Sequence, residues 1–333
     1  MRKLLILALV LCAVGARSQD IHFSQFNVAP MVYNPALAGG FDGDIRLIGN
    51  QRTQWRSVTT PFSTIGVSAD FNHKAQPLMG SAISIYQDRA GDSRLSTLAV
   101  NGAFSYELGR SEDGLHAFTI GAQLGFTHRK IDYSDLTYDS QWNGFQYNAS
   151  ANSGEQFARE TRTHLNLNLG GAWHYTVDRR NKLEGGVALH NATGPKQSFF
   201  DDPSVNLDMR LSISGSGIWQ LNDEWDAIGG ILLSTQGKFV EFIPGGGARY
   251  ILTDERGAFR TVFGGMYYRT KDAGFIMGGM DYDQWRVALS YDINLSNLRP
   301  ASNGRGGFEL SVVYILTRFV PPPGRKRICP EYF

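Results

Sequence analysis

Two stretches of the chain decide the fold: residues 95–108, LSTLAVNGAFSYEL, and residues 163–177, THLNLNLGGAWHYTV. In both, large apolar side chains occupy alternate positions, and small or polar ones stand between them. Side chains of a strand point to its two faces in turn, so each stretch predicts a strand with one apolar and one polar face. The pattern recurs along the chain between turns of Asn, Asp and Gly. It indicates an all-β, up-and-down antiparallel transmembrane barrel whose outer face contacts lipid.

The same alternation, read between turn residues, predicts about fourteen strands with ends uncertain by a few residues. They fall near residues 44–55, 62–72, 78–86, 95–108, 115–130, 163–177, 182–190, 205–221, 225–235, 239–252, 258–269, 274–282, 285–295 and 307–319. An even number of strands brings the two ends of the chain to the same side of the membrane. We therefore expect both termini in the periplasm.

The lengths of the connections predict the orientation of the barrel. Bacterial outer-membrane barrels have short periplasmic turns and longer extracellular loops. Connections after odd strands are mostly long, at 56–61, 87–94, 131–162, 191–204 and 296–306, and those after even strands are short. Two odd connections, near Gln236 and Lys271, are short as well. The long loops, above all 131–162, are thus predicted to face outward.

A soluble β-sandwich would also show alternating strands, so it is the competing architecture. Aromatic residues near the ends of many segments favour the barrel, because the two membrane interfaces are lined by aromatic girdles. The residues concerned are Trp55, Tyr106, Tyr133, Trp173, Tyr175, Trp219, Trp225 and Trp285. Glycines within apparent strands, such as Gly245 to Gly247, suit a strongly curved sheet.

The first residues predict export. Arg2 and Lys3 precede an apolar stretch from Leu4 to Val14, and small residues follow at Ala16 and Ser18. This is the pattern of a signal peptide, which we place at residues 1–18. The rest of the chain then divides into an N-terminal periplasmic or lumenal segment at 19–43, a barrel at 44–319 and a periplasmic tail at 320–333.

Charge and motif content exclude several functions. The chain has 32 Lys and Arg against 31 Asp and Glu, and loss of Arg2, Lys3 and Arg17 leaves 29 against 31. A chain with nearly equal numbers of positive and negative side chains is not expected to bind nucleic acid. Neither an H-E-x-x-H nor a G-x-S-x-G motif occurs. We predict no enzyme activity, catalytic residue, metal or cofactor. After signal cleavage Cys329 stands alone, so no disulfide forms within one chain.

Several motifs carry a family resemblance. The segments are Asp20 to Phe26 (DIHFSQF), Tyr33 to Gly39 (YNPALAG), Asn50 to Trp55 (NQRTQW), Ser290 to Ser296 (SYDINLS) and Gly307 to Ser311 (GFELS). Together they resemble the PorP/SprF family over nearly the whole mature chain. The ending Cys329 to Phe333 (CPEYF) is similar to the family's CPR ending, with Glu331 in place of the basic residue.

The resemblance implies a non-enzymatic outer-membrane component of the type IX secretion system of Bacteroidota. It implies protein partners: periplasmic components of that system, or secreted cargo such as adhesins, including gliding-type adhesins, held through a C-terminal domain. The strand pattern alone does not distinguish core machinery from a dedicated adhesin anchor. The alternatives are a passive channel or small-molecule transporter and, third, a barrel enzyme acting on lipid.

Three regions are candidate contact sites, each with a purely structural alternative. In the motif segment the candidate contact residues are Phe23, Ser24, Gln25, Asn34, Pro35, Ala38 and Gly39. The alternative is structural, because an Asn-Pro pair also favours a turn. With Phe26, Met31 and Tyr33 the segment is expected to narrow the periplasmic mouth. In the tail the candidate contact residues are Arg325, Lys326, Arg327, Cys329, Pro330 and Phe333. The alternative is a tail that is only solvated and binds no partner. In the longest loop the candidate contact residues are Tyr138, Trp142, Phe145 and Tyr147. The alternative is a loop that folds into the barrel as a plug.

Overall fold

The computed structural model describes residues 20–54, 60–73, 79–91, 94–133, 136–152, 158–255, 257–296 and 304–317. Three one-turn helices come first: η1 (Phe26–Val28), α2 (Pro30–Tyr33) and η2 (Pro35–Leu37). The strands are β1 (Ile45–Gln54), β2 (Phe62–Asn72), β3 (Met79–Ala90), β4 (Leu95–Arg110), β5 (His116–Lys130), β6 (Thr161–Thr176), β7 (Lys182–His190), β8 (Arg210–Gln220), β9 (Trp225–Gln236), β10 (Phe239–Glu255), β11 (Ala258–Arg269), β12 (Ala273–Tyr282), β13 (Trp285–Asn294) and β14 (Arg305–Leu316). A further short helix, η3 (Asp139–Gln141), lies in the β5–β6 connection.

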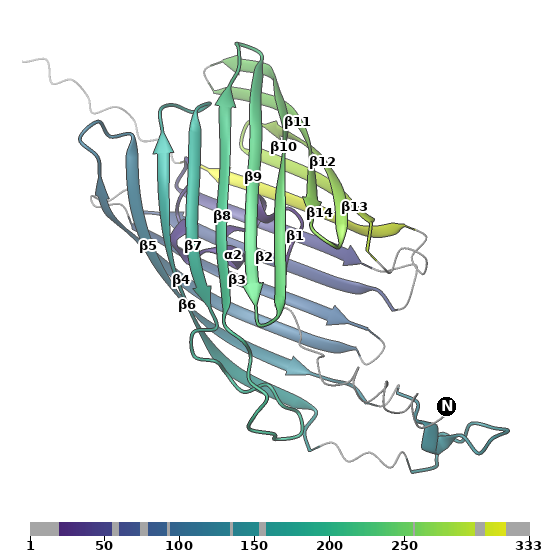
Figure 1. The fold of residues 1–333 in the computed structure, drawn as a ribbon. Helices are drawn as coiled ribbons and strands as arrows, with labels where there is room; N and C mark the ends of the chain where they lie inside the picture. The colour runs from purple at the N-terminus through teal and green to yellow at the C-terminus, as the bar shows by residue number, and fades with distance from the viewer. Residues whose placement is uncertain are drawn as a thin grey trace, which may run out of the picture.

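Each strand pairs antiparallel with its neighbours in sequence, and β1 pairs with β14 to close the barrel (Figure 1). The predicted fold is therefore confirmed. The largest error in strand bounds is at β8, which begins at Arg210 and not near residue 205. The preceding residues instead form a loop, in which Lys196 bridges to Asn206.

The two ends of the barrel differ, and we name them by their connections. The loop end carries the connections from odd to even strands, including the long β5–β6 and β7–β8 connections. The turn end carries those from even to odd strands, such as the β6–β7 and β12–β13 turns. Within the described residues, no helix is both long enough and apolar enough to cross a membrane.

The alternating faces lie as the sequence predicts. Outward-facing Leu124 is 70% exposed, whereas the preceding residue Gln123, which faces the lumen, is 3% exposed. Aromatic side chains gather on the outer face at the turn end, where Trp225 contacts Tyr250 and Trp285 contacts Tyr314 at centroid distances of 4.9 and 4.5 Å. An apolar belt edged by aromatic rings is typical of a barrel surface in contact with lipid.

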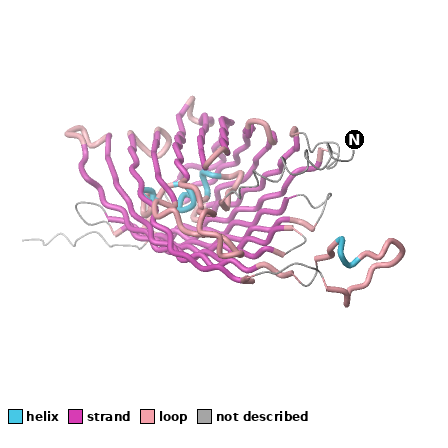
Figure 2. The backbone as a smooth tube through the Cα atoms, turned by 60° about the horizontal axis from the view of Figure 1, so that its bottom comes forward, coloured by secondary structure: helices cyan, strands magenta, loops and turns pink. Residues whose placement is uncertain are grey.

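The packed apolar core lies inside the barrel. Phe23, Phe26 and Tyr33 from the N-terminal residues pack against lumen-facing wall residues that include Tyr267 and Phe275. Figure 2 shows the short N-terminal helices enclosed by the ring of strands, whereas η3 lies well outside it. The lumen is thus occupied by residues 20–43, which we call the lumenal segment.

The lipid-facing assignment predicts a depth-dependent cost for a charge on the outer face. Leu124→Arg, in the middle of β5, should lower the free energy of unfolding in lipid vesicles by about 2–4 kcal/mol, because Arg at the midplane loses its hydration. The same change at Val240, an exposed residue beside the loop end of β10, should cost at most about 1 kcal/mol. Urea titrations of the two variants measure both values, and equal costs would contradict the assignment.

Candidate functional site

The lumenal segment runs along the barrel from the loop end to the turn end. At its start, Asn191 donates to the Asp20 carboxylate (2.7 Å), and the Asp20 amide donates to Gln236 Oε1 (3.2 Å). Both partners lie where strands meet the loop end. Near its end, the Gly39 amide donates to Asp70 of β2 at the turn end (3.0 Å). The segment is therefore not confined to the mouth on the turn side, where we expected it.

The amides of the motif residues Ser24 and Gln25 are held by one carboxylate. They donate to the two oxygens of Glu309 on β14, at 2.7 and 3.0 Å. The Ser24 hydroxyl donates to Asp292 on β13 at 3.0 Å, and the Gln25 side chain donates to Ser290 Oγ at 3.2 Å. All of these groups are buried, so each hydrogen bond forms away from competing water, where an unpaired group would be costly.

Two arginines complete this cluster. Arg52 of β1 donates to the His22 carbonyl (2.8 Å) and pairs with Asp292 (3.2 Å). Arg269 of β11 donates to Ser24 Oγ (2.7 Å) and pairs with Glu241 (3.1 Å) and Asp292 (3.3 Å). A buried carboxylate without a cation or hydrogen-bond donors beside it is strongly destabilising, and these arginines supply both. Four strands therefore hold the start of the lumenal segment through charged groups.

No local pattern in the sequence predicts this cluster. Residues 52, 292 and 309 stood only inside family-like motifs, and residue 269 was not singled out. One signal was available: each charged side chain occupies a lumen-facing position of its strand, and Asp292 and Glu309 each stand between two outward-facing apolar residues, as in Phe308-Glu309-Leu310. A charge on that face needs a partner inside the barrel. Alternation does not say which strand or segment supplies the partner.

A second group of hydrogen bonds holds the middle of the lumenal segment. The Phe23 amide donates to the Tyr33 hydroxyl (2.8 Å), which donates back to the Phe23 carbonyl (2.9 Å). Arg210 of β8 donates to the Val32 carbonyl at 2.6 Å. Burial raises the pKa of the Tyr33 hydroxyl well above its usual range. Burial, with Arg52 and Arg269 nearby, holds the pKa of His22 well below its ordinary value.

Asn34 and Pro35 make the predicted turn. Asn34 is extended (φ −159°, ψ 116°), as a residue before proline should be, and Pro35 begins η2. The Asn34 Oδ1 accepts the Ala36 amide (2.9 Å) and caps that helix, while its Nδ2 donates to the Gly171 carbonyl of β6 (3.0 Å). The structural reading of this pair is confirmed. Whether the motif also contacts a partner stays a prediction.

Glycines in the wall make room for this turn. A Cβ on Gly121 of β5 would lie 2.5 Å from the Ala36 nitrogen, and one on Gly170 of β6 would overlap the Asn34 side chain. Backbone can approach backbone this closely only where the side chain is a hydrogen. These glycines therefore serve the close fit of the segment as well as the curvature of the sheet.

Gly121→Ala tests this fit. The added methyl must displace the turn at Pro35 and Ala36, so we expect the unfolding free energy to fall by about 1–3 kcal/mol. Ion conductance in planar bilayers should rise as the lumenal segment shifts. Gly102→Ala on β4 is the matched control, because its Cβ would meet no heavy atom within 4 Å. Unchanged thermal stability and conductance in Gly121→Ala would show that the fit is not tight.

The β5–β6 connection carries a compact lobe, residues 138–152, that projects away from the barrel (Figure 2). Gln141 organises it: its Nε2 donates to the Ala151 carbonyl (3.0 Å) and its Oε1 accepts from Tyr147 Oη (3.2 Å). Trp142 bridges to Tyr147, and Phe145 at the tip is 94% exposed. The described part of this loop does not plug the barrel, so the alternative of an inward fold is wrong for it.

The β7–β8 connection lies across the mouth at the loop end. Arg129 of β5 donates to Gln197 Oε1 (2.5 Å), and Leu207 is buried. Asp201 at its turn accepts from Arg159 (2.8 Å) and Arg162 (3.2 Å). Hydrogen bonding to Arg159 is the main reason that the pKa of Asp201 lies below its ordinary value. The two long connections are thus joined to each other.

Lowering the pH should separate these connections. The pairing stabilises the carboxylate form, so it is complete above the ordinary Asp pKa of about 3.9 and is lost as the pH falls through the lower value that Asp201 has here. Spin labels at Ser140 and at the exposed Val205, in a Cys329→Ser background, should give a broader distance distribution at acid pH. Asp201→Asn should be broad already at neutral pH.

Asp202→Asn is the matched control for this measurement. The Asp202 carboxylate bonds to Ser204 within its own loop (2.7 Å), so its loss should leave the distance at neutral pH unchanged. A narrow distribution in Asp201→Asn at neutral pH would contradict the role assigned to the Arg159 and Arg162 pairs.

Several of the predicted residues lie outside the part of the chain that the structure describes. The tail residues Arg325, Lys326, Arg327, Cys329, Pro330 and Phe333, the signal peptide and Trp55 lie outside the described residues. His174 contacts Thr119 (3.2 Å) and Glu184 (3.3 Å) in the lumen. Among the described residues, no group of three His, Cys, Asp or Glu side chains is placed to hold a metal ion.

Several solved structures match the chain at low sequence identity. The Ralstonia pickettii toluene transporter TbuX matches with 11% identity and a TM-score of 0.46, over 86% of this chain and 92% of that one. A mutant of the monoaromatic hydrocarbon channel TodX matches with 12% and 0.47, over 88% and 94%. A Pseudomonas aeruginosa FadL homologue gives 9% and 0.43, over 84% and 92%. No curated protein matches the sequence.

The family comparison covers most of the chain. The model of the type IX secretion system membrane protein PorP/SprF family matches residues 16–314. The matched residues include the lumenal segment and every strand except the last residues of β14. The chain belongs to the PorP/SprF family of type IX secretion system membrane proteins.

Proposed function

We propose that this protein is a non-enzymatic outer-membrane component of the type IX secretion system that supports export or surface attachment of secreted proteins, adhesins among them, through protein–protein contacts. Family membership supports the secretion role. A closed antiparallel barrel with an apolar outer belt supports insertion in the outer membrane. In this proposal the loop end faces outward and the turn end faces the periplasm.

The observation that carries the proposal is the filled lumen. A passive channel needs an open path, but here residues 20–43 run along the barrel and are bonded to strands on several sides. The bonds include Ser24 to Asp292 on β13, Asn34 to Gly171 on β6 and Ser105 on β4 to Ala38 (2.6 Å). Groups held by many buried hydrogen bonds leave only at a large cost in free energy. This favours a protein that works through its surfaces over one that conducts solutes.

The outward surface suits protein recognition. The lobe at 138–152 presents Trp142 and Phe145 on a hairpin stabilised by Gln141. Exposed aromatic rings on a pre-organised loop give a large contact area at a small entropic cost. We assign this lobe the contact with secreted cargo. The tail residues 325–333 are the second candidate contact, with periplasmic partners.

The proposal is tested by replacing the exposed rings. In a strain that carries Trp142→Ser with Phe145→Ser, we expect at least a tenfold loss of cargo protein that co-purifies with the barrel in mild detergent, since interface aromatics commonly contribute about 2 kcal/mol each. Quantitative mass spectrometry of the purified complex and of the cell surface measures the loss. The amount of barrel in the outer membrane should not change.

Leu221→Ser is the control, because Leu221 is an exposed apolar residue at the opposite end and should leave cargo binding unaffected. Deletion of the whole chain should reduce one or more secreted proteins at the cell surface. If the wild-type barrel purifies without protein partners and its deletion leaves the secreted set unchanged, the secretion role is wrong and the channel alternative gains support.

A further inference from the structure

One edge of β6 extends beyond its neighbour near the loop end. β6 pairs with β5 along nearly its whole length, but with β7 only as far as Leu169. β7 ends at His190, because the next residue, Asn191, has a left-handed backbone (φ 56°) and its side chain bonds to Asp20 in the lumen. Residues 161–168 of β6 therefore lie past the end of β7.

Hydrogen bonds at the two ends of β6 show which of its backbone groups face this edge. The Glu160 carbonyl accepts from the Ile131 amide (3.0 Å), and the Thr176 amide donates to the Leu115 carbonyl (2.9 Å), both on the β5 side. Backbone groups of a strand point to its two neighbours in alternation. The even-numbered residues of β6 therefore bond to β5, and the odd-numbered residues face the edge.

The β7–β8 connection covers this edge only in part. The Leu167 and Leu165 carbonyls accept from the Ala192 amide (2.9 Å) and from the Thr193 hydroxyl (3.3 Å). Among the described residues, nothing hydrogen-bonds to the backbone N–H or C=O of Thr163 or to the N–H of Leu165. A row of unpaired N–H and C=O groups on a strand is a template for pairing with another chain.

The level of this edge in the barrel makes it accessible from outside. On the outer face, the Thr163 hydroxyl bonds to the His128 ring at 2.8 Å, and both side chains are exposed. Such a polar pair marks the boundary of the apolar belt, where water can reach backbone groups that hydrocarbon would leave unpaired. The outward-facing positions at 161, 163 and 165 are Thr, Thr and Leu, so neither a charge nor a proline blocks pairing.

We propose that this edge binds an extended segment of a secreted protein, which adds to the barrel as a strand beside residues 161–165 of β6. The proposal rests on the secretion role and deepens it, because it names how the partner is held. An extended backbone presents N–H and C=O groups at the repeat of about 7 Å per two residues that β6 requires. The outward Thr and Leu side chains favour β-branched or apolar residues at alternate positions of the partner.

The first test asks whether the edge is open. With the full chain in lipid nanodiscs, NMR measures the exchange of single amides with deuterium oxide. We expect the Thr163 and Leu165 amides to exchange about tenfold faster or more than those of Arg162 and His164, which bond to β5. Equal protection of the four amides would show that the edge is covered and would overturn the proposal.

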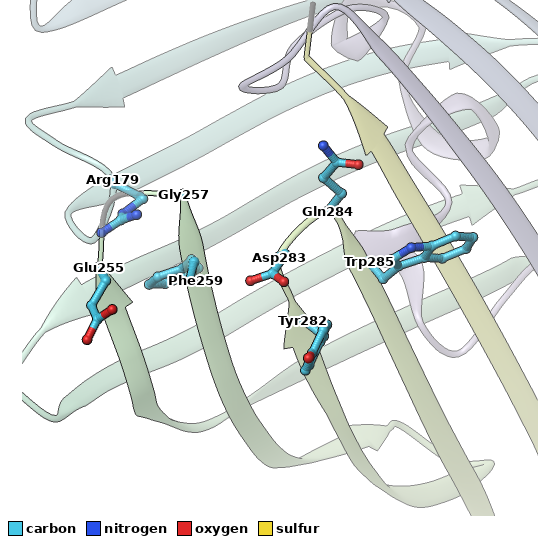
Figure 3. Close-up of a pocket in the computed structure, with 9 residues that line it drawn as sticks. Arg179, Glu255, Gly257, Phe259, Tyr282, Asp283, Gln284 and Trp285 are labelled. Atoms are coloured by element: carbon cyan, nitrogen blue, oxygen red, sulfur yellow. The ribbon is translucent and has the colours of Figure 1, made fainter. Parts of the chain in front are cut away.

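The second test identifies what binds there. The photoreactive residue benzoylphenylalanine replaces Thr161, Thr163 or Leu165 in the native outer membrane, and mass spectrometry locates the cross-linked residues of secreted proteins. A strand held in one register should give cross-links to a single segment, shifted by two residues for each step of two along β6. Benzoylphenylalanine at Gln284, exposed beside a pocket at the opposite end of the barrel (Figure 3), is the control and should not label that segment.

A proline at the edge tests the backbone contact itself. Thr163→Pro removes an N–H that faces the edge and leaves the bonds to β5 in place, so cross-linking from position 165 should fall about fivefold or more. The amount of barrel in the membrane should not change. Thr163→Val, which keeps the N–H and the β-branched shape, is the matched control and should cross-link as the wild type does.

The outcomes separate this proposal from the secretion role. Cross-links scattered over several segments, cross-links to a second copy of this chain, or no cross-links from a barrel that still co-purifies with secreted protein would overturn strand addition alone. Unchanged cross-linking in Thr163→Pro would do the same. If no secreted protein is cross-linked and none co-purifies, strand addition and the secretion role are both wrong.

Discussion

Every part of this structure depends on the closure of one sheet. In hydrocarbon, each unpaired backbone N–H or C=O costs several kcal/mol, so a sheet that crosses a membrane cannot leave an edge. Pairing of β1 with β14, from Ile45 with Leu316 to Thr53 with Phe308, removes that edge. Closure also sorts the side chains, because alternate residues must then face either lipid or lumen. The apolar belt and the polar lumen are two consequences of the same constraint.

A polar lumen of this size must be filled by water or by the chain. Here the chain occupies it, and the lumenal segment and the inner wall of the barrel together form a packed core. The apolar residues of the lumenal segment, such as Phe26, pack on Tyr267 at 6.1 Å between ring centroids. Its backbone amides meet carboxylates of the wall, as at Glu309. Its one-turn helices satisfy many of its own amides, whereas the amides of Asp20, Ser24, Gln25 and Gly39, outside those helices, find their partners in wall side chains.

This arrangement bears on function in two ways. With the lumen occupied by a bound segment, the two rims are the surfaces through which we propose that the barrel acts. At the loop end, the β5–β6 and β7–β8 connections are tied together by Arg159, Arg162 and Asp201, and the second of them contacts the start of the lumenal segment through Asn191. Surface and lumen are therefore in physical contact, and the family's role in secretion is compatible with a barrel used as a scaffold.

The sequence by itself determined the class of fold, the number of strands and which residues face lipid. These follow from local alternation, which needs no knowledge of partners distant in the chain. The turn at Asn34 and Pro35 was predictable for the same reason, since its chemistry lies within neighbouring residues. Errors at the ends of strands, as at β8, arose where a loop bonds to itself and to β6 instead of extending the ladder.

Only the tertiary structure decided what the lumenal segment touches. Arg52, Arg269, Asp292 and Glu309 are separated by up to 257 positions, and no local pattern relates them to Ser24. It also decided that the long loop projects outward and that β7 pairs with only part of β6. These features depend on the register and closure of the whole barrel, because side chains that share a cavity are brought together by strands far apart in sequence.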